Sequence, residues 1–294
     1  MNQTNPLSGY FRQPSIYLTL PSNGRYYPQG SLELSESGDV AVYPMTAKDE
    51  MQMNNPDALL NGQAVCDLIK SCAPAIKDPW QMPLMDLDSL LVAIRIASYG
   101  KTLKITTIVP KVNKELEYET DLNVLMDMID KTPWNESIKL QNGLTVKLRP
   151  TTYKTLTELQ NKTYFERRAV ITAQNSELSP EDKNKKFADA FKSIANITVS
   201  SMITAIKSIV TAEGEEVVNP EYIKEFVNNL DSVTAKEINN FIDQENAKGR
   251  LPDITIQVPE DLVEKGAPPT YQTPISMDQS NFFAVNFYHS RLLK

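Results

Sequence analysis

The chain has 294 residues, a formal net charge of −7 and an isoelectric point near 5.0. This length is enough for one large hydrophobic core or two smaller ones. An acidic chain lacks the dense basic face that nucleic acid requires, and no apolar run approaches the roughly 20 residues of a membrane span, so we expect protein partners, with no nucleic acid and no membrane.

Residues 1–45 are predicted to form an extended N-terminal arm. Prolines interrupt regular structure along it at Pro6, Pro14, Pro21, Pro28 and Pro44. The aromatic side chains between them are interface candidates: Tyr10, Phe11, Tyr17, Tyr26 and Tyr27. The arm either docks on another protein or wraps its own domain. Docking predicts that a chain without residues 1–30 folds but no longer assembles.

Residues 46–150 are predicted to contain helices and a first β-module. Thr46 with Asp49 is typical of a helix start, and Asn55-Pro56 is expected to begin a helix that runs to Ser71. The next helix, Asp88–Tyr99, ends at Gly100 and is apolar nearly all round, which predicts burial.

Arg95 is the charged residue inside that apolar helix. It either forms a buried salt bridge with Asp86, Asp88 or another acid, or it contacts a partner protein; the salt bridge is the interpretation we favour.

A frame similar to a zinc ribbon, but without metal ligands, occurs twice. In the first copy, strands at Lys104–Val109 and Glu115–Tyr118 flank Val109-Pro110-Lys111-Val112, where a metal knuckle would read Cys-Pro-x-Cys. The second copy begins at Asp253–Pro259 and continues at Tyr271–Met277. Valine cannot bind zinc, so we expect two small β-modules packed by apolar side chains, with no metal and no cofactor.

Two further elements are predicted before residue 150. Asp121–Lys131 has the apolar spacing of a short amphipathic helix. Ile138–Leu148 is predicted to be a β-hairpin whose Asn142-Gly143 pair forms a type I′ turn.

Residues 151–250 are predicted to be a helical bundle inserted between the two β-modules. The first helix is Thr151–Gln174, and the second runs from Ser179-Pro180 to about Thr211. A third helix begins at Asn219-Pro220. Thr234 with Glu237 forms a predicted capping box for a fourth, which Gly249 ends.

Residues 251–294 are predicted to hold the second β-module and a last helix, Ser276–Leu293. Its aromatic side chains are the remaining interface candidates: Phe282, Phe283, Phe287 and Tyr288. They either close the core or anchor a neighbour. The fold class is therefore α+β, mainly helical, with two small metal-free zinc-ribbon-like β-modules and an extended N-terminal arm.

The sequence offers no convincing catalytic set. His289 is the single histidine, and the carboxylate neighbours Glu215-Glu216 and Asp86/Asp88 are interpreted as solvated or helix-capping groups. No glycine-rich phosphate loop is present. Cys66 and Cys72, six residues apart, are expected to be free thiols, as in a reducing cytoplasm.

Two segments resemble the T-even-type myophage baseplate protein family. They are Leu20–Tyr27 followed by Tyr43–Glu50, and Asp88–Gly100 with the strand and Val-Pro-Lys-Val turn after it. Asp121-Leu122 and the terminal Asn281-Phe282-Phe283 are also similar to the family pattern. Because valines stand at the turn, metal binding does not carry over.

The resemblance implies a non-enzymatic structural component of a contractile phage tail baseplate. Such a protein would join the hub or tail tube to neighbouring baseplate proteins, in several copies, within a virion assembled in the host cytoplasm. One alternative is a hub-assembly chaperone that is absent from the mature virion. A tail-associated hydrolase is disfavoured by the lone histidine and the missing metal ligands.

Overall fold

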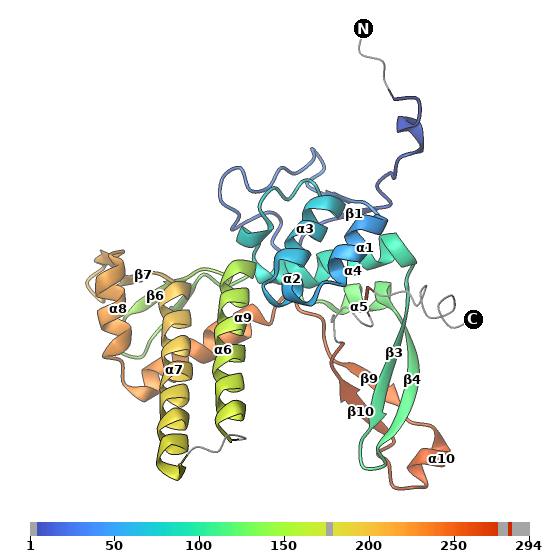
Figure 1. The fold of residues 1–294 in the computed structure, drawn as a ribbon. Coiled ribbons are helices and arrows are strands. Elements are labelled where there is room, and N and C mark those ends of the chain that lie inside the picture. Colours follow the sequence, from blue (N-terminus) through green and yellow to red (C-terminus); the bar gives the residue numbers. More distant parts are fainter. Residues whose placement is uncertain (1–4, 175–178, 276–281, 284–294) are drawn as a thin grey trace.

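The computed structural model describes residues 5–174, 179–275 and 282–283, which form an α+β chain with two main hydrophobic cores (Figure 1). A short 3-10 turn, η1 (Ser8–Tyr10), precedes the first core. The first core is built from β1 (Ile16–Leu18), β2 (Val40–Val42), α1 (Ala47–Met53), α2 (Pro56–Leu60), α3 (Gln63–Cys72), η2 (Pro79–Gln81), α4 (Leu84–Tyr99) and α5 (Leu122–Met128).

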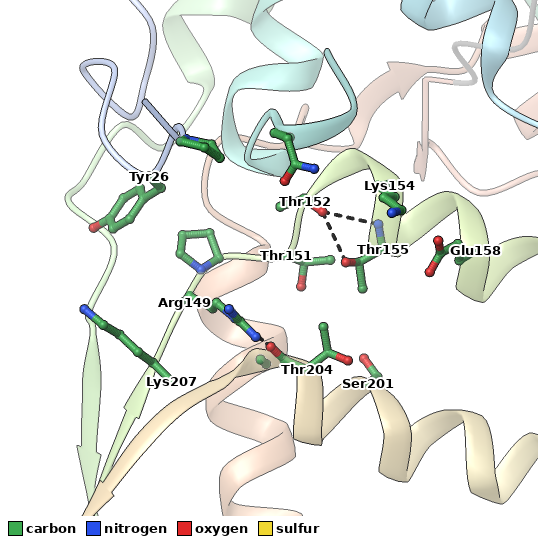
Figure 2. Close-up of a pocket in the computed structure, with 14 residues that line it drawn as sticks. Tyr26, Arg149, Thr151, Thr152, Lys154, Thr155, Glu158, Ser201, Thr204 and Lys207 are labelled. Atoms are coloured by element: carbon green, nitrogen blue, oxygen red, sulfur yellow. Dashed lines mark hydrogen bonds between the residues drawn. The ribbon is translucent and has the colours of Figure 1, made fainter. Parts of the chain in front are cut away.

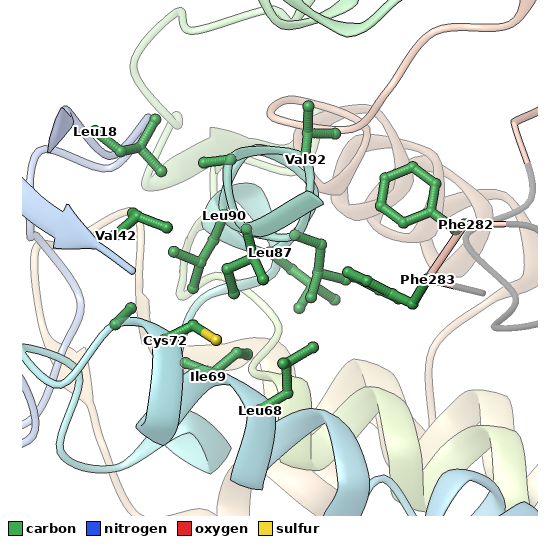
Figure 3. Packing of buried hydrophobic residues seen from close by; sticks show 14 of the residues in the cluster. Leu18, Val42, Leu68, Ile69, Cys72, Leu87, Leu90, Val92, Phe282 and Phe283 are labelled. Atoms are coloured by element: carbon green, nitrogen blue, oxygen red, sulfur yellow. The ribbon is translucent and has the colours of Figure 1, made fainter. Parts of the chain in front are cut away.

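Helix α4 is the centre of the first core. Every residue from Leu84 to Arg95 is buried, as its nearly all-round apolar sequence predicts. Figure 3 shows its side chains between the β1–β2 pair, helix α3 and the aromatic pair Phe282 and Phe283. Segments from both ends of the chain therefore pack on one helix.

Two β-hairpins project together from the first core (Figure 1). Strands β3 (Thr102–Val109) and β4 (Lys114–Asp121) pair antiparallel over their whole length. Strands β9 (Ile254–Gln257) and β10 (Thr270–Thr273) form the second hairpin, with α10 (Glu260–Val263) in the connection between them.

The second core lies under a four-stranded antiparallel sheet, β5 (Ser137–Lys139), β6 (Thr145–Leu148), β7 (Ile206–Val210) and β8 (Glu216–Val217), in that order. Helices α8 (Pro220–Asn228) and α9 (Ser232–Asn246) and the end of α7 (Pro180–Ala205) contribute its other apolar residues. Helix α6 (Tyr153–Gln174) pairs with α7 in a long helical hairpin that projects beyond both cores (Figure 1).

The helix predicted to run from Ser179 to Thr211 is wrong at its C-terminal end. Helix α7 begins as predicted, with Ser179 as N-cap, but stops at Ala205, and Ile206–Val210 is a strand. This strand pairs with β6, where Leu148 lies opposite Ile206. The β-branched Ile and Val residues favour a strand once that partner is present. The supposed bundle at 151–250 therefore supplies two strands, and the sheet crosses the predicted boundary at residue 150.

Three local predictions need correction. The helix expected from Asn55 to Ser71 is split into α2 and α3 at Gly62, whose φ is +78°. Helix α9 is capped by Asp231, which accepts from the backbone N–H groups of Val233 and Thr234, one turn before the predicted box.

The hairpin turn also differs from the prediction. Gly143 has a φ of +86°, but Asn142 is not among the non-glycine residues with positive φ. A type I′ turn requires positive φ at both positions, so this turn belongs to another class. In contrast, the capping box of Thr46 and Asp49 and the N-cap of α8 at Asn219 are confirmed.

Arg95 forms no salt bridge with Asp86, Asp88 or any other acid that the structure describes. Its guanidinium donates to the carbonyl oxygens of Gly100 and Thr102 at 3.2 and 3.5 Å and lies 4.7 Å from the centre of the Tyr99 ring. Burial lowers the pKa of the guanidinium. The carbonyl dipoles at the end of α4 take the place of a carboxylate.

The close approach of the Gly249 backbone to the backbone of Met85 in α4 can be tested by substitution. The φ of Gly249 is +75°, and a Cβ there would overlap the backbone of Met85. We expect Gly249→Ala to lower the free energy of unfolding by about 3 kcal/mol or more in urea denaturation, because backbone strain and overlap add. The control Gly266→Ala has positive φ but open space, and should cost only about 1–2 kcal/mol. Equal losses in the two variants would contradict the overlap.

Candidate interaction surfaces

Arg12 fixes the point at which the N-terminal segment leaves the first core. Its Nη2 donates to the carbonyl oxygen and the Oγ of Ser71 at 2.7 and 2.9 Å. Its Nη1 donates to the carbonyl oxygen of Pro44 and lies 3.5 Å from Asp49 Oδ2. The guanidinium also lies over the Tyr43 ring. Four residues therefore contact the Arg12 guanidinium and fix its position.

Residues 5–11, here called the N-terminal aromatic segment, extend away from the body beyond Arg12 (Figure 1). Leu7, Tyr10 and Phe11 have exposed fractions of 63, 87 and 57%. Tyr17, on the following strand β1, is 66% exposed. Neighbouring large apolar side chains left in water are typical of surfaces that another molecule covers.

For residues 16–45 the structure shows the alternative in which the predicted arm wraps its own domain. Strands β1 and β2 pair with each other, and Leu18, Leu20, Val40 and Val42 are buried in the first core. A chain without residues 1–30 would lose β1 and part of this core, so the folded truncation expected from the sequence does not suit this architecture.

Tyr26 and Tyr27 belong to the body and not to a free arm. Tyr26 packs edge-on to Trp134 with ring centres 6.2 Å apart, and its hydroxyl donates to Glu136. The Tyr27 hydroxyl donates to Asp86 at 3.0 Å. For this pair of aromatic residues the self-packing alternative is the one observed.

Asp86 is a buried carboxylate that ties the N-terminal segment to α4. It accepts from the backbone N–H and the hydroxyl of Ser22 and from Tyr27. Burial raises the pKa of Asp86 to about 6, and these hydrogen bonds oppose the shift. Asp88 instead accepts from Arg250 Nε and the Leu251 N–H, both at 2.9 Å. The two aspartates are therefore buried structural groups, not the solvated or capping groups expected.

Phe282 and Phe283 close the first core, with 1 and 5% exposed fractions (Figure 3). Their rings meet edge to face, 4.9 Å apart. They are thus core residues in this structure, as one of the two alternatives predicted. The other C-terminal candidates, Phe287 and Tyr288, and the single histidine, His289, lie outside the described residues.

The two β-hairpins meet through apolar side chains at the turn where a knuckle would hold metal. Val109 is fully buried against Val258, Leu262 and Ala267 of the second hairpin, and Val112 packs on this cluster. The described residues contain no group of three His, Cys, Asp or Glu side chains arranged to hold a metal ion. The likeness of these hairpins to zinc ribbons remains a prediction.

Cys66 and Cys72 are free and buried in the first core, as predicted. Burial raises the pKa of each thiol to about 12, so both remain protonated and unreactive near neutral pH.

A pocket of about 560 Å³ lies at the base of the α6–α7 hairpin (Figure 2). Three cationic side chains, Arg149, Lys154 and Lys207, line it together with hydroxyl groups, the Tyr26 ring and one acid, Glu158. Arg149 Nε donates to the carbonyl oxygen of Thr204 at 2.8 Å. Sequence reasoning missed this pocket, because its residues come from segments separated by more than a hundred positions.

The α6–α7 hairpin also exposes large apolar side chains. Phe191 is 69% exposed, and Tyr164, Phe165 and Ile171 are 43, 57 and 56% exposed. Apolar residues that recur every 3.6 positions identify one face of a helix. They do not show whether another part of the protein packs on that face.

The described structure also has no helix that is both long and apolar enough to cross a bilayer. Its exposed apolar segment, cationic pocket and projecting hairpins are candidate surfaces for contacts with other proteins. Comparison with known families agrees: the family model described as T4 bacteriophage base plate protein matches residues 14–258. The chain belongs to this family, and is a structural protein of the phage tail base plate. No curated protein and no solved structure matches it.

The buried Asp86 predicts an unusual dependence of stability on pH. Its pKa is about 6 in the folded chain and about 3.9 when unfolded, so the folded state binds the proton more tightly. Its contribution to stability is therefore full below about pH 4 and falls as the pH rises to about 6, by at most about 3 kcal/mol. Asp86→Asn should remove this fall from urea denaturation curves measured between those pH values. The control Asp253→Asn changes an exposed aspartate and should retain the fall in stability. If stability falls with pH in Asp86→Asn as it does in the unmodified chain, the fall does not come from Asp86.

Proposed function

We propose that the chain is a non-enzymatic subunit, present in several copies, that joins the hub or tail tube of a contractile tail to neighbouring base plate proteins. The observation that carries this proposal is the N-terminal aromatic segment. Its side chains Leu7, Tyr10 and Phe11 are exposed to solvent. The next residue, Arg12, is anchored by four groups of the body. A firm anchor limits the entropy lost when the segment docks on a neighbour.

The family membership supports the base plate location of this role. The core positions support a structural and not a catalytic use of the buried acids. Asp86 and Asp88 are committed to separate hydrogen-bond networks. The exposed Glu216 accepts from Lys147 and Ser208. None of these carboxylates faces a second one with a shared proton, as an acid–base pair would require.

An assembly chaperone is the second candidate function, because a protein with a docking segment can act on the hub and then leave. Quantitative mass spectrometry of purified mature particles separates the two. A fixed ratio of a few copies per particle, relative to a tail-tube protein, supports the structural subunit. Absence from particles, with abundance in the infected-cell lysate, supports the chaperone.

Removing the aromatic side chains of the segment tests its docking role. The double variant Tyr10→Ser with Phe11→Ser should fold with a change in unfolding free energy within about 0.5 kcal/mol, because both side chains are exposed. We expect its incorporation into particles to fall at least about tenfold in a complementation assay. Aromatic residues at the centre of an interface often contribute about 2 kcal/mol or more to the binding free energy.

The matched control is Tyr222→Ser with Val233→Ser, which removes side chains that are 62 and 72% exposed on α8 and α9. This control should enter particles normally. Normal entry of the Tyr10/Phe11 variant, measured by the same mass spectrometry, would rule out docking through the N-terminal aromatic segment.

A further inference from the structure

The pocket at the base of the α6–α7 hairpin is cationic although the chain carries a net charge of −7. Lys154 and Lys207 are both exposed, and neither forms an ion pair with a described residue. Arg149 uses its Nε on a carbonyl oxygen and has no carboxylate partner among those residues. Glu158 is the one acid among the lining residues, and Glu216 acts electrostatically on Lys207 from outside the lining. The pocket is therefore suited to receive carboxylates.

Its size and lining favour a protein segment over a small anion. A volume of about 560 Å³ lies within the usual range of about 300–1,000 Å³ for ligand pockets, and is many times the roughly 30 Å³ of one water molecule. Tyr26, Pro28, Pro150 and Ala205 add apolar surface to the lining. A complementary surface should thus present both carboxylates and an apolar side chain.

The outer face of the β3–β4 hairpin has this composition. Side chains alternate along β4, so Glu115, Glu117 and Glu119 share one exposed face while Leu116 and Tyr118 turn inward. Lys104 pairs with Glu119 at 3.1 Å, but Glu115 and Glu117 form no ion pair with a described residue.

An apolar side chain lies beside the two unpaired glutamates. Ile108 lies opposite Glu115 in the register of the hairpin and is 62% exposed, and Thr106 lies opposite Glu117. Two carboxylates about 7 Å apart next to an exposed isoleucine match the mixed cationic and apolar lining of the pocket.

The pocket and this acidic face cannot meet within one molecule. The α6–α7 hairpin and the β3–β4 hairpin project from the structure apart from each other, with the first core between their bases (Figure 1). The geometry points to a contact between copies, in which Glu115 and Glu117 of one copy enter the Lys154 and Lys207 pocket of the next.

Such a contact joins two different surfaces and is therefore head-to-tail. Repetition of a head-to-tail contact produces a ring when the rotation closes and a filament when it does not. The inference deepens the proposed function and rests on its multi-copy assembly, since it names a second copy of the chain as one of the partners.

Two charge-reversed variants test this contact in the purified full chain. The pocket variant combines Lys154→Glu with Lys207→Glu, and the hairpin variant combines Glu115→Lys with Glu117→Lys. In sedimentation velocity, the unmodified chain should self-associate, and more weakly as salt rises from about 0.05 to about 0.5 M. Each variant alone should show a dissociation constant at least about tenfold higher, because like charges then face each other.

An equimolar mixture of the two variants should recover association. The native acidic face of the pocket variant fits the native pocket of the hairpin variant, and the two reversed surfaces fit each other with inverted sign. The matched controls Lys192→Glu with Lys236→Glu, and Glu213→Lys with Glu264→Lys, make the same net charge changes at other exposed positions. They should associate as the unmodified chain does.

Three outcomes would overturn the contact: an unmodified chain that remains monomeric at low salt, single variants that associate normally, or a mixture that stays dissociated. Loss of association in the controls as well would assign the effect to net charge and would also overturn it. Because the readout is association of purified protein, it is independent of particle incorporation, which tests the proposed function.

Discussion

Two buried carboxylates on α4 hold together parts of the chain that are far apart in sequence. Asp86 binds Ser22 and Tyr27, and Asp88 binds Arg250 and Leu251. Positions two apart on a helix point to different sides, so one turn of α4 reaches both the N-terminal segment and the loop that follows α9. A buried carboxylate without partners costs several kcal/mol, so the first core is formed with these segments in place.

The second core depends on a connection of unusual length. Strands β6 and β7 are direct neighbours in the sheet, yet the whole α6–α7 hairpin lies between them in the chain. Helix α6 starts beside the first core at Tyr153, and α7 ends in the second core at Met202 and Ala205. The hairpin thus links the two cores at its base, and no described segment forms a third layer over its far end, which is why its aromatic residues are exposed there.

Local signals in the sequence predicted the elements that depend on neighbouring residues. The capping box at Thr46, the proline starts at Ser179 and Asn219, and the buried character of α4 follow from groups within a few positions. The strand β7 could not be predicted in this way, because its partner β6 lies some sixty residues earlier. Nor could the hydrogen bonds of Asp86 and Asp88, whose partners lie at the two ends of the chain.

Among the candidate interface residues, residue type alone did not separate docking from packing. The five aromatic residues of the arm looked equivalent in sequence, yet Tyr10 and Phe11 are exposed whereas Tyr27 hydrogen-bonds to a buried acid. Tyr10 and Phe11 lie before Arg12, where no described residue belongs to a strand, whereas Tyr27 lies after it and packs on the body; Tyr17, in β1, is paired in a strand and still exposed. The anchor, which lies between two aromatic runs, is the physical boundary of the segment.

A base plate protein must expose apolar surface for its partners and still avoid indiscriminate association. This chain places that surface in small, separate areas, each bordered by charge: the segment beyond Arg12, Ile108 beside the glutamates of β4, and the aromatic residues of a lysine-rich helical hairpin. A net charge of −7 adds mutual repulsion between copies. In the proposed contact between copies, complementary charge would overcome this repulsion and select the neighbour, while the apolar side chains would supply affinity.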